Sequence, residues 1–139
     1  MLYRLRLVQT PNLNGVWTAR LSSSLDEYQK EFEATVYIHQ TWSRISLCYE
    51  TEDLLGESLM ASFRVITEDR VMLNYEYRSK KKPEFSNEEF MHHGLSHIMI
   101  PVVNGVVTDK LSGDYYTDRS RQSYGKIILI RKIASNNAR

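Results

Sequence analysis

The sequence predicts an all-β fold, a small antiparallel up-and-down β-barrel of about eight strands with a lipocalin-like shape. Three observations predict it. Period-two alternation rich in Tyr, Val, Ile, Thr and Phe recurs along the chain, whereas helical spacing is nearly missing. Most joins between these blocks have hairpin length. A chain of 139 residues with so many strands must also hide their edges. Closure into a barrel does this, and a β-sandwich of similar strand count is the alternative.

The alternating blocks give the expected strands in order. They are Tyr3–Val8, Gly15–Ser23, Phe32–Gln40, Ser43–Thr51, Ser58–Ile66, Val71–Arg78, Gly94–Val103, Val107–Asp118 and Tyr124–Ile133. Turn-forming residues separate them at Pro11–Gly15, Thr67–Asp69 and Asn104–Gly105. In the polar join Lys80–His93, Ser86 and Glu89 have capping-box spacing and indicate one helical turn. No repeat, low-complexity tract or linker interrupts the chain, so a single domain over residues 1–139 is expected.

The charge balance excludes a strong general attraction to nucleic acid polymers or anionic lipid. Lys and Arg number 18 against 17 Asp and Glu, a net charge of +1. Phosphate recognition would therefore depend on a few placed arginines. The single Cys48 cannot form an intramolecular disulfide, which fits a reducing compartment. No transmembrane helix or signal peptide is indicated, so this chain is expected to be soluble and cytoplasmic. The alternating start at Met1–Arg6 also fits a natural protein whose membrane anchor precedes it.

Catalytic and metal-binding signatures are missing from the sequence. No nucleophile–base pair, metal-ligand spacing or phosphate-cradling glycine loop is present. Adjacent His92 and His93 point apart on a loop, and no Cys or carboxylate stands at ligand spacing from them or from His97. We therefore expect no enzyme, no cofactor and no metal.

Binding has better support from the aromatic residues. In the segment Leu73–Arg78, alternation places Leu73, Tyr75 and Tyr77 on the inner face. Glu76 and Arg78 then face outward. The tyrosine rings either fill the core or form the walls of a pocket.

Two corners of the predicted barrel carry arginine. Arg119 and Arg121 share one side near a barrel mouth, where they pair either with ligand phosphate or with Asp114 and Asp118 in surface salt bridges. The opposite hairpin corner, Gln40–Arg44, sets the Trp42 indole beside Arg44. Trp42 is either a stacking platform for a ligand or a cap on the barrel.

Six segments together resemble one protein family in their order and spacing. They are Leu13–Trp17, Gln40–Trp42, Ser58–Ser62, Leu73–Tyr77, His93–Gly94 and Leu111–Arg119. The family is the membrane-associated β-barrel effectors of bacterial cyclic-oligonucleotide-based antiphage signalling (CBASS). The resemblance implies two N-terminal transmembrane helices followed by a cytosolic lipocalin-like barrel that senses a cyclic dinucleotide. It also implies ligand-induced homo-oligomerisation, disruption of the inner membrane and abortive infection. This chain lacks both helices, so it would be the sensing domain alone.

A cyclic dinucleotide offers phosphates to arginines, flat bases to aromatic rings, and base edges to amides and hydroxyls. The candidate rings are Trp42, Tyr75, Tyr77 and Tyr115, the candidate charges are Arg44, Arg119 and Arg121, and the candidate readers of base edges or sugars are Gln40, Asn74 and Thr117. Two other readings stay open at this point. One is a lipocalin-like carrier of a hydrophobic small molecule, and the other is a structural adaptor that associates through its strands.

Overall fold

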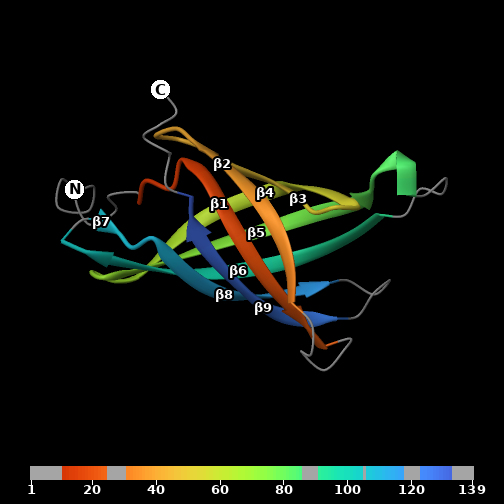
Figure 1. Ribbon diagram of the computed structural model, residues 1–139. Coiled ribbons are helices and arrows are strands. Elements are labelled where there is room, and N and C mark those ends of the chain that lie inside the picture. Colours follow the sequence, from red (N-terminus) through yellow and green to blue (C-terminus); the bar gives the residue numbers. More distant parts are fainter. Residues whose placement is uncertain (1–10, 25–30, 86–90, 105, 118–122, 133–139) are drawn as a thin grey trace, which may run out of the picture.

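The structure, a computed structural model, describes residues 11–24, 31–85, 91–104, 106–117 and 123–132. Its strands form an antiparallel barrel (Figure 1). They are β1 (Gly15–Ser23), β2 (Glu31–Gln40), β3 (Ile45–Glu50), β4 (Leu54–Thr67), β5 (Arg70–Lys81), β6 (Met91–Val103), β7 (Val106–Val107), β8 (Lys110–Thr117) and β9 (Tyr124–Arg131). In the described part of the chain, β1 to β6 pair in sequence order, β8 and β9 follow, and β9 pairs with β1 to close eight strands. This confirms the predicted up-and-down barrel.

One predicted strand is wrong. Val107–Asp118 was expected to be continuous, but it is divided into β7 and β8 by Thr108 and Asp109. The register explains the break: Val102 pairs with Val107 and Met99 with Ser112, so the two β6 residues between these pairs face four on the other strand. Arg131 holds the extra residues, because its backbone N–H donates to the Asp109 carbonyl at 2.8 Å and its Nε lies 3.3 Å from Asp109 Oδ1.

Other differences are confined to strand ends and joins. β3 begins at Ile45 instead of Ser43 because Thr41 N–H bonds the Arg44 carbonyl, which closes the turn between β2 and β3. The predicted turn at Asn104 has the positive φ of 53° that asparagine tolerates. The join after β5 contains a 3₁₀ turn, η2 (Pro83–Phe85). The predicted strand Tyr3–Val8, the capping-box residues Ser86 and Glu89, and Ile133 lie outside the described residues.

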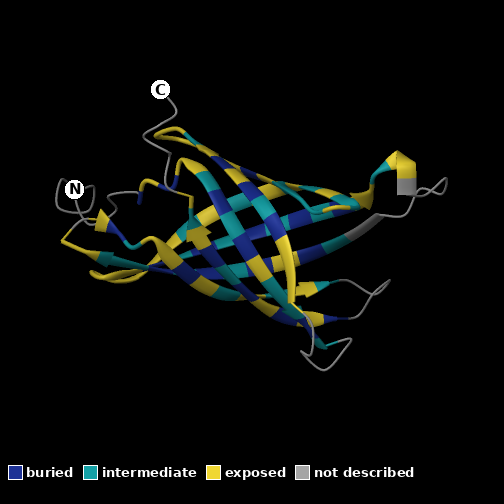
Figure 2. Cartoon of the chain, in the orientation of Figure 1, coloured by how far each residue is buried: buried dark blue, intermediate teal, exposed yellow. Residues whose placement is uncertain are grey.

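The core fills the middle of the barrel, where inward and outward residues alternate along each strand (Figure 2). Trp17, Leu73, Ile127 and Leu129 lie in this core and are at most 5% exposed. Trp17 Nε1 donates to the Leu13 carbonyl at 2.9 Å, and the Arg131 guanidinium lies 4.4 Å from the centre of the indole ring. These contacts seal the end of the barrel where the described chain begins and ends, which we call the terminal end.

At the opposite end of the barrel, here called the tyrosine end, the same cross-strand pairing of a tyrosine with a glycine occurs three times. Each of three inward tyrosines lies directly across from a glycine on the next strand, and the ring covers that glycine. The pairs are Tyr49 with Gly56, Tyr77 with Gly94, and Tyr115 with Gly125. Each hydroxyl then reaches the strand beyond, where the partners are Ser79 Oγ, the Tyr116 carbonyl and the Ser22 carbonyl respectively. Every tyrosine therefore ties three consecutive strands of the barrel together.

We expect Gly125→Ala to destabilise the barrel by about 1–3 kcal/mol, the usual cost of overpacking. A Cβ at this position would overlap the Ser22 carbonyl oxygen of β1 and the Tyr115 ring. The measurement is the free energy of unfolding from a denaturant titration. Lys126→Ala, which changes the adjacent exposed residue, is the control and should stay within about 0.5 kcal/mol. Equal stability of both variants would contradict the described contact.

Candidate ligand-binding site

The barrel wall is split between β3 and β4. These strands pair only at Cys48 with Glu57, Tyr49 with Gly56, and Glu50 with Leu55, all near the tyrosine end. Toward the terminal end they diverge (Figure 1), while β4 keeps its pairing with β5 as far as Thr67. A register shift in β4 between Ser58 and Met60 marks the start of the divergence, and there the Ser58 hydroxyl accepts the Leu47 N–H at 2.9 Å. The facing edges of the two strands are left without a ladder in the described chain.

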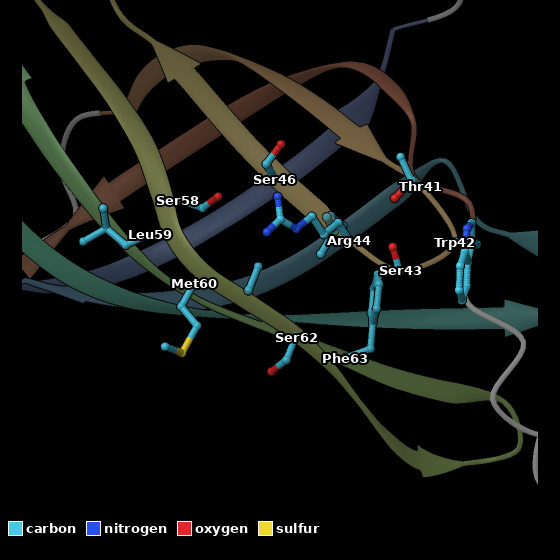
Figure 3. A pocket seen from close by; sticks show the side chains of 12 residues that line it. Thr41, Trp42, Ser43, Arg44, Ser46, Ser58, Leu59, Met60, Ser62 and Phe63 are labelled. Atoms are coloured by element: carbon cyan, nitrogen blue, oxygen red, sulfur yellow. The ribbon is translucent and has the colours of Figure 1, made fainter.

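A cleft of about 580 Å³ occupies this split (Figure 3). One wall comes from the β2–β3 hairpin and β3, and the other from β4. The lining residues are Thr41, Trp42, Ser43, Arg44, Ile45, Ser46, Ser58, Leu59, Met60, Ala61, Ser62 and Phe63. Three of these, Ile45, Ala61 and Phe63, also pack against the core, so the cleft opens onto the apolar interior. Its exposed rim combines polar residues with the apolar side chains of Trp42, Leu59 and Met60.

The chemistry of the lining favours an anionic ligand with flat rings. Five residues contribute hydroxyls, Trp42 and Phe63 contribute rings, and Arg44 carries the one formal charge among the lining residues, which include no carboxylate. Within the described chain, the Arg44 guanidinium forms no ion pair or hydrogen bond. The Trp42 side chain is 94% exposed, so its indole face is accessible. An available guanidinium beside an available ring is suited to a phosphate next to a base.

A second hollow of about 550 Å³ on the barrel surface has a different character. Its lining includes the carboxylates of Glu50 and Glu57. Arg78 in this lining already forms an ion pair with Glu57. Lys82 Nζ lies 2.7 Å from Glu50 Oε2, and this hydrogen bond raises the pKa of the Lys82 ammonium. Arg78 and Lys82 are thus already engaged with carboxylates, whereas Arg44 in the cleft between β3 and β4 faces no carboxylate in the lining, which makes that cleft the stronger candidate for an anionic ligand.

The predicted site residues do not gather in one place. Trp42 and Arg44 line the cleft at the terminal end. Gln40 lies next to it, but its amide holds the start of the described chain: Oε1 accepts the Leu13 N–H at 2.9 Å, and Nε2 donates to the Pro11 carbonyl at 2.7 Å. Gln40 is therefore a structural residue in this arrangement.

The predicted tyrosines face inward as expected but lie away from the cleft. Tyr75 and Tyr77 are 9% and 6% exposed. Burial raises the pKa of the Tyr75 hydroxyl, and a hydrogen bond with Ser96 offsets only part of this rise. The hydroxyls of Tyr77 and Tyr115 bond backbone carbonyls across the barrel wall at 3.3 and 3.1 Å. The Thr117 hydroxyl is 2.7 Å from Ser123 Oγ. In the described structure the hydroxyls of Tyr77, Tyr115 and Thr117 therefore form hydrogen bonds within the barrel wall.

The remaining predicted residues divide between the outer face and the undescribed part of the chain. Asn74 lies on the outer face of β5, where its Oδ1 forms a hydrogen bond with His97 Nδ1. Its register partner on the neighbouring strand β4 is the cleft residue Ser62. Arg119 and Arg121 lie outside the described residues. The connection that contains them starts and ends at the tyrosine end, opposite the cleft.

Sequence reasoning missed most of the cleft. Its hydroxyl residues and the ring of Phe63 were not singled out, although the Ser58–Ser62 segment contributed to the family resemblance. One signal was available, since five of the lining residues have hydroxyl side chains and fall in two short segments, 41–46 and 58–62. Only the strand pairing shows that these two segments face each other across a gap.

A closed barrel with a ring-bearing, basic cleft in its wall defines a small ligand-binding barrel. More particularly, the chain belongs to the family described as Cap15, cyclic dinucleotide receptor domain, whose model matches residues 8–131. This match confirms the resemblance to the CBASS barrel effectors. No curated protein matches the chain. Across the described residues, no helix is long and apolar enough to cross a membrane, and no cluster of three potential ligands could hold a metal ion.

Proposed function

We propose that this domain senses a cyclic dinucleotide by binding it in the cleft between β3 and β4. The observation that carries the proposal is the cleft lining: one arginine that has no partner among the described residues, two rings and five hydroxyl residues, without a carboxylate. Its volume of about 580 Å³ is in the usual range of small-molecule sites. Family membership supplies the ligand class, and the cleft supplies groups that match its charge and rings.

Each part of such a ligand has a counterpart in the cleft. Arg44 pairs with a phosphate, since a guanidinium fork fits two phosphate oxygens. Trp42 and Phe63 offer faces for stacking of the bases. Ser43 and Ser62 lie on opposite walls, and their hydroxyls donate to or accept from sugars and base edges (Figure 3). The open edges of β3 and β4 add backbone groups.

Binding without chemistry is the second part of the proposal. The cleft lining contains hydroxyls but no Asp, Glu or His that would act as their general base. We infer that the ligand is bound and released unchanged. In the full-length protein, binding then drives homo-oligomerisation, and transmembrane helices N-terminal to this domain disrupt the bacterial inner membrane, which ends in abortive infection. Family membership supports this part.

A carrier of hydrophobic molecules would need space inside the barrel. Trp17, Leu73 and Ile98 in its centre are 0% exposed, which leaves no water-sized void beside them. The centre is therefore a packed core, and the carrier reading gains no support from the described residues.

Calorimetric titration of the chain with a panel of cyclic dinucleotides tests the proposed function. We expect at least one member to bind with a Kd at or below about 10 μM, and the matching linear dinucleotide to bind at least about tenfold more weakly because its ordering costs more. Mononucleotides serve as a second control. No heat of binding from any panel member, at protein concentrations well above micromolar, would contradict the proposal.

A further inference from the structure

Exposed apolar side chains gather on the β-hairpins of the terminal end. Three hairpins project there, between β2 and β3, β4 and β5, and β6 and β7 (Figure 1), and their tips are exposed (Figure 2). The large apolar side chains on them are Trp42 at 94%, Val65 at 39%, Ile66 at 41%, Val103 at 57% and Val106 at 67% exposed. Hairpin turns usually carry polar residues, so apolar side chains on all three tips indicate a contact with something outside the chain.

Two of these hairpins, β4–β5 and β6–β7, lie side by side. The Val102 N–H donates to the Asp69 carbonyl at 2.8 Å, and Arg70 pairs with Pro101 between β5 and β6. The three valines and the isoleucine that are exposed on these two tips are not part of the barrel core. The two tips therefore present their apolar side chains together at the rim of the barrel.

Positive charge surrounds these tips, although the net charge of the whole chain is only +1. Among the described residues of the three hairpins and the adjoining strand ends, six are basic and three are acidic. The basic residues are Arg44, Arg64, Arg70, Lys110, Arg131 and Lys132, and the acidic residues are at positions 68, 69 and 109. Arg64 and Arg70 flank the β4–β5 tip, and both are exposed. The terminal end therefore complements a negatively charged surface.

The arrangement fits the surface of an anionic bilayer better than a protein partner. The apolar side chains are on separate tips, whereas a protein interface needs a closely packed, continuous core. Lipid headgroups fill the space between separate tips, so each apolar side chain can enter the interface by itself. Tryptophan favours the headgroup level, and arginine and lysine near the surface are attracted to anionic lipid.

We propose that the hairpin tips of the terminal end dock the barrel on an anionic lipid surface. Ile66, Val103 and Val106 then reach into the headgroup region, and Arg64 and Arg70 pair with lipid phosphates. The contact belongs to the barrel itself and involves no cyclic dinucleotide, so the inference goes beyond the proposed function.

Vesicle flotation with this chain tests the docking. Vesicles of equal parts phosphatidylglycerol and phosphatidylcholine are compared with vesicles of phosphatidylcholine alone, at an ionic strength of about 0.1 M, where charges at the far end of the barrel are screened. We expect the parent to partition at least about tenfold more strongly onto the anionic vesicles. Arg64→Gln/Arg70→Gln should lower this partitioning at least about tenfold, and Ile66→Ser/Val106→Ser at least about fivefold.

Each variant has a matched control away from the terminal end. Lys80→Gln/Lys81→Gln removes the same charge at the tyrosine end, and Leu55→Ser/Leu95→Ser removes two exposed apolar side chains elsewhere on the barrel. Both controls should partition within about twofold of the parent. Thermal unfolding checks that every variant is folded. Trp42 is left unchanged because it also lines the cleft.

Two outcomes would overturn the proposal. One is parent partitioning that is equal on the two kinds of vesicle or absent from both, and absence from both would leave the tips to a protein partner. The other is a loss of partitioning in either variant that is no greater than in its matched control. Neither outcome bears on the proposed function, because the titration with cyclic dinucleotides uses no lipid.

Discussion

Replacing Arg44 by alanine is expected to weaken binding of the cyclic dinucleotide by roughly 10- to 100-fold. A hydrogen bond to a charged group contributes about 1.5–3 kcal/mol, and Arg44 is the only charged residue in the cleft lining. Because its guanidinium has no partner in the described chain, its removal breaks no ion pair and should leave folding unchanged. Titration calorimetry measures the affinity, and thermal unfolding checks the fold.

Arg20→Ala is the matched control for this experiment. Arg20 is exposed on β1 and does not line the cleft, so its removal changes the net charge equally without touching the site. We expect parent affinity within about twofold for this variant, since a remote exposed charge is screened by salt. Arg44→Lys should bind between the parent and Arg44→Ala, because a lysine keeps the charge but loses the planar fork. Equal losses in Arg20→Ala and Arg44→Ala would contradict the assigned cleft.

Trp17→Ala is expected to lower the free energy of unfolding by about 3–5 kcal/mol, the range for removal of a fully buried aromatic side chain. Trp17 is 0% exposed, its Nε1 bonds the Leu13 carbonyl, and Arg131 lies over its ring. The substitution therefore opens a cavity and removes a hydrogen bond at the terminal end. Denaturant titration gives the free energy of unfolding.

Trp42→Ala is the matched control, because it is the same substitution at an exposed tryptophan. With 94% of its side chain exposed, Trp42 should contribute less than about 0.5 kcal/mol to stability. The same variant should lose roughly fivefold or more in ligand affinity, at the low end of about 1–3 kcal/mol for base stacking, because one face of the indole remains open to water. Equal destabilisation by both tryptophan substitutions would contradict the described core.

Local patterns were sufficient to predict most of the barrel. The alternation that begins at Gly15 and ends at Ser23 gives β1 without error, because an apolar face with period two can be buried only in a strand. The inward face of Leu73, Tyr75 and Tyr77 follows from the same rule. The break between β7 and β8 was not predictable in this way. It depends on the backbone and side chain of Arg131, more than 20 residues later in the sequence, which hold Asp109.

The candidate site was only partly predictable, because it exists where two strands stop pairing. Trp42 and Arg44 could be found from their types and their place on a hairpin. Phe63 and the serines of β4 look like ordinary strand residues until the three-pair ladder between β3 and β4 is known. Gln40 was misleading for the opposite reason, since its amide suits a nucleotide but binds Pro11 and Leu13. The predicted roles of Arg119 and Arg121 stay predictions.

The three tyrosine–glycine pairs make the two ends of the barrel mechanically unequal. At the tyrosine end, each ring ties three strands, and the wall there resists spreading. At the terminal end, the described residues of β3 and β4 have no such tie between them. These two strands can therefore separate there more easily than at the tyrosine end. A molecule held between these strands would press on the β2–β3 hairpin, which carries Trp42 and Arg44. Because the Gln40 amide bonds the Pro11 carbonyl, a displacement of this hairpin would be transmitted to Pro11, at the start of the described chain.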